Sequence, residues 1–353
     1  MIFTSDNASG AAPEVLAALT AANDGYTLPY GADPVSARVE ARIREIFEAP
    51  EARVLLVATG TAANSLALAA LCPPWGSTFC HRIAHVEEDE CNAPVFFTGG
   101  AKLAHVEGPD ARIDPAALAH AVAHAGAGVV HSAQPSAVSI TQATERGAVY
   151  TVETIAEIGA IARGHGLGLH MDGTRFANAL ARTNATPAAM SWRAGVDILC
   201  LGATKCGALA AEAIILFEPE RHPGKAWELE LRRKRAGHLF SKMRFVAAQM
   251  EAWLAGDLWL RLAAHANAMC DRLAAGLGAA GVEIASPGEA NLLYAHITLA
   301  QHRRLQAAGA VYYVTNPPVL PDGQDDARLE IRLVCSFATR EADVDAFLAA
   351  LSG

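Results

Sequence analysis

The chain has 353 residues, of which 52% are hydrophobic and only 18% are charged, and its formal net charge is −9. That length suggests more than one domain, or a large α/β unit with an appendage, and the acidic balance argues against general nucleic-acid binding. A composition this apolar is unusual for a monomer of this size, and it predicts that part of the protein surface is buried between subunits.

Two further classes are excluded by the apolar pattern and the first residues. No apolar run approaches the roughly 20 residues that a bilayer-spanning helix needs, so we expect no membrane association. The opening MIFTSDNASG (1–10) carries an acid early and lacks a basic and then apolar leader, so we expect no secretory signal. The seven cysteines include no C-x-x-C pair, which favours a reduced, cytoplasmic enzyme.

Strand-like and helix-like segments alternate up to about residue 217. The apolar run RVLLVAT (53–59) predicts a buried strand, and 61–72 predicts the helix after it. Asp114-Pro115 opens another helix, because an acidic N-cap followed by proline is typical of a helix start. Apolar strands separated by helices indicate a mainly parallel sheet covered on both faces. The other predicted strands are 128–132, 136–140, 167–172, 196–202 and 212–217, with helices around 151–163 and near 187–194.

The pattern changes after Phe217. Residues 222–280 are almost wholly helical in character, and from about residue 282 short strands alternate with helices. We therefore predict a large α/β domain over residues 1–250 and a smaller C-terminal α+β domain over residues 251–353.

The segment ATGTAANS (58–65) joins a predicted strand to a helix. In open parallel sheets, ligands bind outside the carboxyl ends of the strands. Small residues let backbone N–H groups approach an anion, and a helix N-terminus favours negative charge. The segment is neither a dinucleotide fingerprint nor a Walker loop, so a plain turn and a phosphate-binding loop both stay open.

A second strand end, in LHMDGTRFANA (169–179), carries Asp172, with Arg175 three residues later. One interpretation is a helix N-cap with a local ion pair. The other is a carboxylate that keeps a heterocyclic nitrogen protonated.

The third strand end, LGATKCGALAAE (201–212), contains Lys205 as its only basic residue. Most lysines are surface groups, but small and apolar neighbours suit a tight, buried turn. A buried, isolated ammonium is costly and tends to lose its proton, and a neutral lysine can form a Schiff base with a carbonyl. An anion loop, an acid for a pyridine nitrogen and a later Schiff-base lysine are together what pyridoxal phosphate requires.

The sequence resembles the L-threonine aldolase family, and within it the low-specificity and phenylserine aldolases, along nearly the whole chain. This resemblance implies the fold of the aspartate-aminotransferase-like, type I pyridoxal-phosphate enzymes. The segments that carry it are SDN near the start, YGADP (30–34), GTAANSLAL (60–68), HVEEDE (85–90), SITQATE (139–145), LHMDGTRFANA (169–179), GATKCG (202–207) and SKMRF (241–245).

The resemblance implies a role for each cofactor-binding residue. Pyridoxal phosphate would form its Schiff base with Lys205, and Gly60 and Thr61 would hold its phosphate. Asp172 would pair with the pyridine nitrogen, and His85 would stack on the face of the ring.

The resemblance also implies how the substrate binds. Arg332 would clamp the amino-acid carboxylate, assisted by Ser5 and by Arg175, which also lies near the cofactor. Arginine suits this role because its guanidinium binds a carboxylate through two parallel hydrogen bonds.

The implied reaction is retro-aldol cleavage of L-β-hydroxy-α-amino acids, such as L-threonine, L-allo-threonine or phenylserine, to glycine and an aldehyde. His85 and His131 match two family histidines near the hydroxyl group, and one of them would be the base, directly or through water. Histidine suits proton transfer because its pKa lies near working pH. From the residues alone, a strand-end residue without a catalytic role is the favoured interpretation of His131.

Paired histidines also raise the question of a metal. His81 and His85 are four residues apart, as are His120 and His124, and this spacing on a helix can bind zinc. We expect no metal ligand, because the resemblance favours ring stacking for His85 and a solvated helix face explains the second pair. A cation held by the acidic residues 87–90 stays open as an alternative.

The basic segment RRKRAGHLFSKMR (232–244) is either a solvated face or, as the resemblance implies, a region that approaches the cofactor phosphate of a neighbouring subunit. We therefore expect a homodimer or homotetramer with active sites at the dimer interface. Two departures from the family pattern, Ala32 and Cys206, remove no catalytic group but leave the preferred substrate open.

Two alternatives compete with the aldolase prediction. One keeps the cofactor and changes the bond that breaks, as in a β-eliminating lyase, a transaminase or a racemase. The other is a non-catalytic relative or a metal-dependent binding protein, which would lack a cofactor on Lys205.

Overall fold

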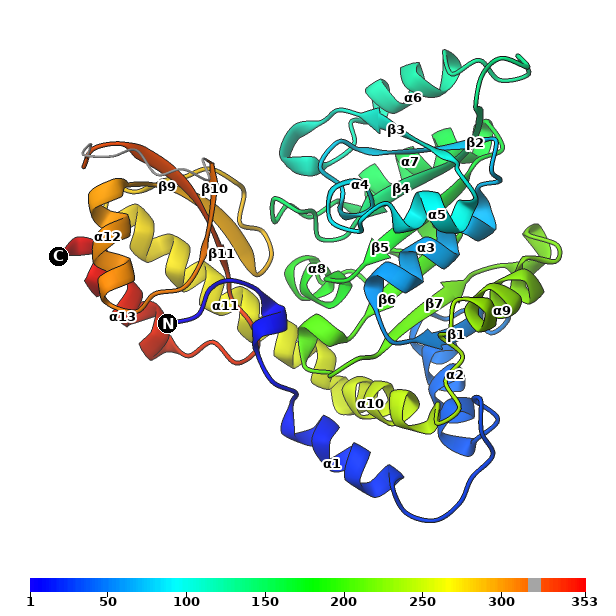
Figure 1. Ribbon diagram of the computed structural model, residues 1–353, viewed down its shortest axis with the longest axis horizontal. Helices are drawn as coiled ribbons and strands as arrows, with labels where there is room; N and C mark the ends of the chain where they lie inside the picture. Colours follow the sequence, from blue (N-terminus) through cyan, green and yellow to red (C-terminus); the bar gives the residue numbers. More distant parts are fainter. Residues whose placement is uncertain (317–324) are drawn as a thin grey trace.

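The computed structural model describes residues 1–316 and 325–353, which form two sheets surrounded by helices (Figure 1). Within these residues the larger sheet has seven strands in the order β1-β7-β6-β5-β4-β2-β3, and only β7 runs antiparallel to its neighbours. The predicted mainly parallel sheet is therefore confirmed. Its strands are β1 (Arg53–Val57), β2 (Gly76–His81), β3 (Lys102–Val106), β4 (Gln134–Thr141), β5 (Gly168–Gly173), β6 (Ile198–Gly202) and β7 (Glu212–Leu216).

Helices cover both faces of this sheet. Along β6, Ile198 and Cys200 pack into one hydrophobic core with α3, whereas Leu199 and Leu201 pack into another. Successive side chains of a strand point to opposite faces, so a strand that is apolar throughout has no solvent face. The helices of the first 254 residues are α1 (Pro13–Ala22), α2 (Pro34–Ile46), α3 (Gly60–Leu71), α4 (His85–Glu88), α5 (Ala93–Thr98), α6 (Pro115–Ala123), α7 (Val152–Gly164), α8 (Phe176–Thr183), α9 (Lys225–Arg235) and α10 (Arg244–Leu254).

The smaller, antiparallel sheet has four strands in the described residues, in the order β10-β11-β9-β8. One of its faces packs on helices, and Phe3 from the N-terminus joins that core. The elements of this part are α11 (Leu258–Ala279), β8 (Glu283–Ile284), β9 (Leu292–Thr298), α12 (Leu299–Ala307), β10 (Tyr313–Asn316), β11 (Arg328–Val334) and α13 (Glu341–Ser352).

The long helix α11 runs between the two hydrophobic cores. Ala263 belongs to the core of the large sheet, and Met269 belongs to that of the small sheet. The boundary predicted after residue 250 lies within α10 and stays a prediction. None of the helices in residues 1–316 and 325–353 has both the length and the apolar character that a membrane span needs.

Two predicted elements are wrong. Residues 128–132 form an exposed turn instead of a strand, because Gly126 and Gly128 adopt positive φ angles of 78° and 76° and the Gln134 side chain bonds across the turn. The helix expected near 187–194 is only a short 3₁₀ turn at Trp192–Ala194.

Candidate functional site

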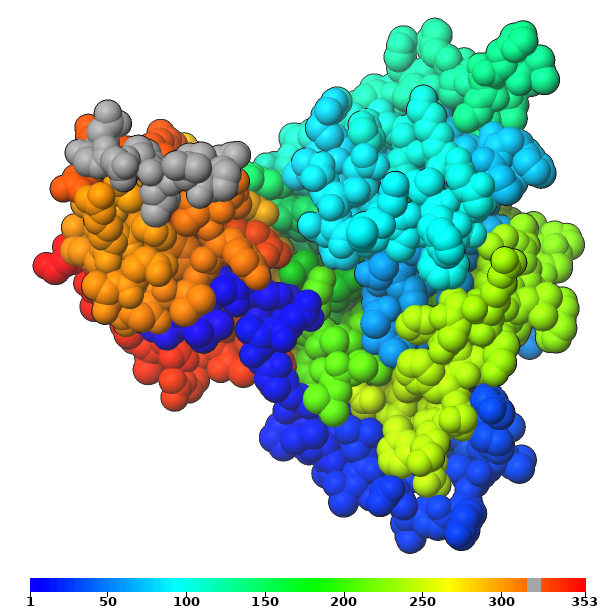
Figure 2. All heavy atoms as spheres, viewed as in Figure 1, coloured from blue at the N-terminus to red at the C-terminus, as the bar shows by residue number. Residues whose placement is uncertain are grey.

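The carboxyl ends of the parallel strands meet beside the small sheet, and two adjoining cavities open there. Their volumes are about 540 Å³ and about 410 Å³. His85, Lys205, Asn7 and Asp89 line both cavities. Figure 2 shows the surface hollowed between the two lobes, with the blue N-terminal segment crossing beside the hollow.

Asp172 lies at the end of β5 with only 2% of its surface exposed. It accepts hydrogen bonds from the Thr174 N–H at 2.9 Å and from Asn64 Nδ2 at 2.8 Å. Burial raises its pKa, but His85, the hydrogen bonds from Thr174 and the charge of Lys205 outweigh burial and hold the pKa below its usual value. Asp172 is therefore a buried carboxylate that stays ionised, as a partner for a protonated ring nitrogen should.

Lys205 follows β6 in a short turn, Thr204–Cys206, that is held rigidly in place. The Ala12 N–H donates to the Gly207 carbonyl at 2.8 Å, and the Ala211 N–H donates to Thr204 Oγ1 at 3.2 Å. Gly207 has a φ of 106°, and a Cβ there would lie 2.7 Å from Leu262 Cδ1, so any other residue would strain the turn.

The ammonium of Lys205 has no carboxylate within 4.0 Å among the residues the structure describes. Burial lowers its pKa, the positive charge of Arg175 lowers it further, and Asp6 and Asp172 oppose this. A lowered pKa increases the neutral, nucleophilic fraction of the lysine.

The loop 58–61 lines the larger cavity and leads into α3. Thr59 caps the helix by accepting a hydrogen bond from the Ala62 N–H at 3.2 Å. The first N–H groups of a helix, here those of Gly60 and Thr61, have no acceptor inside the helix. Together with the helix dipole they suit a phosphate group.

His85 begins α4 and is held by two glutamates, the buried Glu90 and the half-buried Glu145. Its Nδ1 lies 2.8 Å from Glu90 Oε1, and its backbone N–H donates to Glu145 Oε1 at 2.8 Å. Burial lowers the pKa of His85, but Glu90 and the charge of Asp172 outweigh burial and leave the pKa raised. Asn64 Nδ2 donates to both Glu90 and Asp172 at 2.8 Å, which links the His85 ring to the carboxylate of β5.

The same cluster contains three groups that could hold a metal ion. Ligand atoms of His85, Glu90 and Asp172 all lie within 4.8 Å of one another. Hydrogen bonds through His85 Nδ1 and Asn64 already connect these groups.

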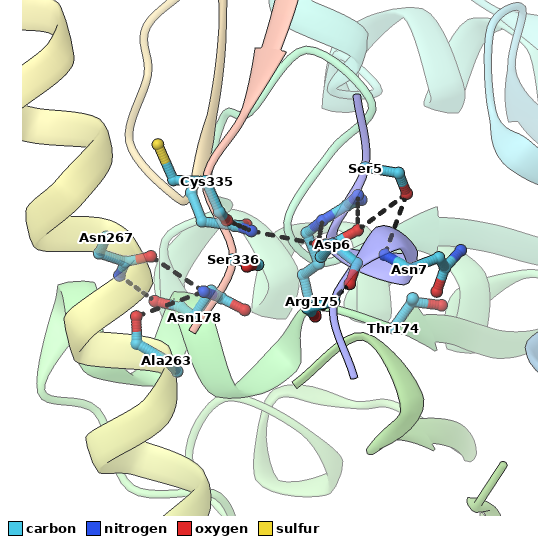
Figure 3. A network of polar contacts seen from close by, with 12 residues as sticks. Ser5, Asp6, Asn7, Thr174, Arg175, Asn178, Ala263, Asn267, Cys335 and Ser336 are labelled. Carbon is cyan, nitrogen blue, oxygen red and sulfur yellow. Dashed lines mark hydrogen bonds and ion pairs between the residues drawn. The ribbon is translucent and has the colours of Figure 1, made fainter. Parts of the chain in front are cut away.

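The smaller cavity carries two arginines. Arg175 is 8% exposed and binds Asp6 through Nε at 2.8 Å and Nη2 at 3.0 Å (Figure 3). Asn291 Nδ2 also donates to Asp6, at 3.1 Å. Arg332, by contrast, donates only weakly to the Thr4 carbonyl, at 3.4 Å, and pairs with no carboxylate within 4.0 Å in the described chain.

Burial lowers the pKa of Arg332, and Arg175 lowers it further. Tyr294 and Tyr313 lie directly opposite Arg332 on the neighbouring strands. Ser5 lines the same cavity, and its Oγ accepts the Asn7 N–H at 3.1 Å. A half-buried guanidinium that has no carboxylate partner and is flanked by these groups is suited to bind a carboxylate.

The structure brings together all but one of the predicted site residues. His131 is exposed in the turn before β4, whereas the cavities lie beyond the carboxyl end of that strand. At about 3.3 Å per residue, the eight residues of β4 alone put His131 roughly 25 Å away. Within the described residues of one chain, the predicted position of His131 near the substrate is therefore wrong.

Four polar residues of the site, the buried Asp6, Asn64 and Glu90 and the half-buried Glu145, were not predicted as site residues. Glu90 is five residues after His85 and Glu145 follows a predicted strand, so both carry a weak sequence signal. Asp6 pairs with a residue 169 positions away, and nothing local in the sequence indicates such a contact.

Comparison with known proteins adds relatives of similar length. The family model described as beta-eliminating lyase matches residues 3–300. A low specificity L-threonine aldolase of Pseudomonas aeruginosa is 43% identical over 313 residues, which cover 88% of both chains. A second one, from a Pseudomonas species, is 40% identical and covers 97% of this chain and 94% of its own.

A solved structure of Leishmania major threonine aldolase is also similar. It is 28% identical, has a TM-score of 0.90 and covers 99% of this chain and 98% of its own. The similarity therefore extends over both sheets and over the cavities between them.

Proposed function

Because the chain belongs to the β-eliminating lyase family and, within it, to the L-threonine aldolases, we propose that it cleaves L-β-hydroxy-α-amino acids to glycine and an aldehyde. The substrates are of the threonine, allo-threonine and phenylserine type. The reaction is a retro-aldol cleavage, and the enzyme is an aldehyde-lyase.

The observation that carries this proposal is the position of Lys205. Its side chain lines both cavities. The larger cavity offers a helix N-terminus, and two of its lining residues, Asn64 and Thr174, are hydrogen-bonded to the buried carboxylate of Asp172. The smaller cavity offers two guanidinium groups. One reactive amine thus faces a phosphate-and-ring site on one side and an amino-acid site on the other.

The residues of the larger cavity fit pyridoxal phosphate, together with Asp172, which is hydrogen-bonded to the lining residues Asn64 and Thr174. Lys205 would bind it covalently, Gly60 and Thr61 would hold its phosphate, Asp172 would keep its ring nitrogen protonated, and His85 would stack on the ring. When bound, the cofactor draws off the electron pair left at Cα after the Cα–Cβ bond breaks. The unpaired Lys205 and the ionised Asp172 support this assignment.

The residues of the smaller cavity fit the substrate. Arg332 would bind the α-carboxylate, since it is half-buried, lines this cavity and has no carboxylate partner in the described part of the chain. Arg175 is oriented by Asp6 and would contribute a further N–H, and Ser5 would add a hydroxyl group. These contacts would leave the β-carbon and its substituent within the same cavity.

We also propose a homodimer or a homotetramer. Tyr26 is fully exposed and Leu28 is 65% exposed, both in the loop beside the basic segment 232–244. Exposed apolar side chains next to arginines and lysines suit an interface between copies. A cytoplasmic location stays a prediction from the cysteine pattern.

Absorbance spectroscopy followed by product identification tests the function. Purified protein supplied with pyridoxal phosphate should show a visible band that changes when glycine is added. L-threonine or phenylserine should then yield glycine and acetaldehyde or benzaldehyde in equal amounts. Release of ammonia and a keto acid instead would indicate β-elimination and overturn the aldolase proposal, and a protein without the band would overturn the cofactor.

A further inference from the structure

Glu145 is one of two carboxyl groups of the smaller cavity, with Asp89, to which the proposed function gives no role. It lies in the loop after β4, next to the start of α4. Its Oε1 accepts hydrogen bonds from the His85 N–H and from Thr141 Oγ1, both at 2.8 Å. Its Oε2 is buried and has no hydrogen-bond partner among the residues the structure describes.

An unpartnered carboxyl oxygen in the interior requires an explanation. A buried acceptor that is left unsatisfied costs free energy, and native proteins contain few of them. Glu145 lines the cavity in which Lys205, Arg175 and Arg332 would hold the amino and carboxylate groups of a substrate. The missing hydrogen bond of Oε2 would be supplied by a substrate hydroxyl group that donates to it, and a proton bound to Oε2 would remove its negative charge.

The electrostatic surroundings favour proton transfer at Glu145. Burial raises its pKa and the negative charge of Asp172 adds to this, while the hydrogen bonds from His85 and Thr141 oppose it. A carboxylate with a raised pKa is a stronger base than a solvated one. Asp89, the other carboxylate of this cavity, is exposed to solvent.

We propose that Glu145 is the general base that takes the proton of the substrate β-hydroxyl group, a role that depends on the proposed aldolase function. The O–H bond breaks, and its electron pair becomes the second bond of the aldehyde carbonyl. The pair of the Cα–Cβ bond stays with Cα, which later takes up a proton to give glycine. Glu145 returns its proton to water, so no net proton is released.

The decisive variant is Glu145→Gln. The amide oxygen of glutamine can still accept the hydrogen bonds from His85 and Thr141, but the side chain cannot take a proton. We expect kcat/KM for L-threonine cleavage to fall about 10²- to 10⁴-fold, the usual contribution of a general base. Glycine has no β-hydroxyl group, so its dissociation constant, from the absorbance change, and its α-proton exchange rate should stay within about threefold.

Thr141→Val is the matched control, because it removes one donor to Glu145 and leaves the carboxyl group in place. Its cleavage rate should stay within about fivefold of the wild-type rate. Cleavage by Glu145→Gln within threefold of wild type would overturn the proposal. A parallel loss of glycine binding and exchange would also overturn it, since the role would then be structural.

Failure of the proposed function would look different. Wild-type protein that shows no spectral response to glycine, or that forms no aldehyde, would refute the aldolase before Glu145 is tested.

Discussion

The two sheets present functional groups in different ways. In the large sheet, β5 is buried at all six positions, and its contribution to the site, Asp172, comes at its carboxyl end. In the small sheet, β11 alternates: Leu329, Ile331 and Leu333 are buried in the core, while Glu330 and Arg332 lie on the other face. Arg332 thus enters the site from the middle of a strand.

This difference follows from how each sheet is covered. A parallel sheet with helices on both faces leaves only the strand ends free for a ligand. An antiparallel sheet covered on one face offers every second side chain along a strand. Substitutions at strand ends of the large sheet should therefore alter chemistry, while those along β11 should alternate between stability and binding.

The largest effect should come from Lys205→Ala beyond the end of β6. Removing the Schiff-base lysine should lower turnover at least about 10³-fold. The midpoint of thermal unfolding should stay within a few degrees, because no ion pair is lost. Lys102→Ala, an exposed lysine of β3, is the control and should keep full activity. Comparable activity in the two variants would refute the role of Lys205.

Ile331→Ala should produce the next largest effect, on stability. Ile331 is fully buried, and truncating a buried isoleucine costs about 2–5 kcal/mol. The free energy of unfolding, from denaturant titration, should fall by that amount, while KM at low temperature should change less than twofold. A raised KM with intact stability would show that the two faces of β11 are not functionally separate.

Arg332→Ala, one residue later, should have the opposite effect, raising KM and leaving the free energy of unfolding nearly unchanged. Loss of a charge-assisted hydrogen-bond pair costs about 1.5–3 kcal/mol, so KM should rise about 10- to 100-fold with little loss of stability. Arg328→Ala removes an exposed arginine from the same face of β11 and should leave KM unchanged. Equal KM values in the two variants would contradict the carboxylate clamp.

An effect that is absent at neutral pH should appear in acid at His170, a polar residue in the middle of β5. It contacts Ser139 Oγ at 2.9 Å and Cys200 Sγ at 3.3 Å, and burial lowers its pKa to about 4. Between these two pKa values the histidine of the unfolded chain, with a pKa of about 6.5, is protonated, whereas His170 of the folded chain stays neutral. Stability should therefore fall as the pH falls from about 6.5 to about 4, by at most about 1.4 kcal/mol per pH unit.

Unfolding free energies of the wild type and of His170→Asn, measured across that range, check this expectation. The variant should lose less stability than the wild type as the pH falls. Parallel curves would mean that His170 does not titrate as a buried, neutral group.

His131→Ala should have the smallest effect. The residue is exposed before the amino end of β4, so kcat and KM for cleavage should both change less than twofold. A loss of tenfold or more would show that His131 reaches a site in another way, for instance in a neighbouring subunit.

The sequence predicted those strands of the fold that are continuous runs of apolar residues. The apolar runs 53–59, 167–172 and 196–202 correspond to β1, β5 and β6. The strand β2 went unnoticed because Ser77 and Thr78 interrupt its apolar pattern, although both are buried in the sheet.

The predicted site was incomplete for a similar reason. Lys205, Asp172 and the loop 58–61 follow predicted strands, so the rule for strand ends could find them. Asp6 and Glu145 act through partners that are distant in the sequence or that lie on another element. His131 was misplaced because the resemblance matched it to a family histidine near the hydroxyl group, whereas the residue lies in an exposed turn before the amino end of β4.

The N-terminal segment also determines when the site can form. Phe3 is hydrogen-bonded to Val311 and to Val334, and Asp6 orients Arg175. During synthesis the first residues emerge long before β11, so they have no strand to pair with until the chain is nearly complete. The large sheet can assemble earlier, because its last strand ends at Leu216 and its contacts span shorter stretches of chain than the pairing of Phe3 with Val334. Activity should therefore be the last property that a newly made chain acquires.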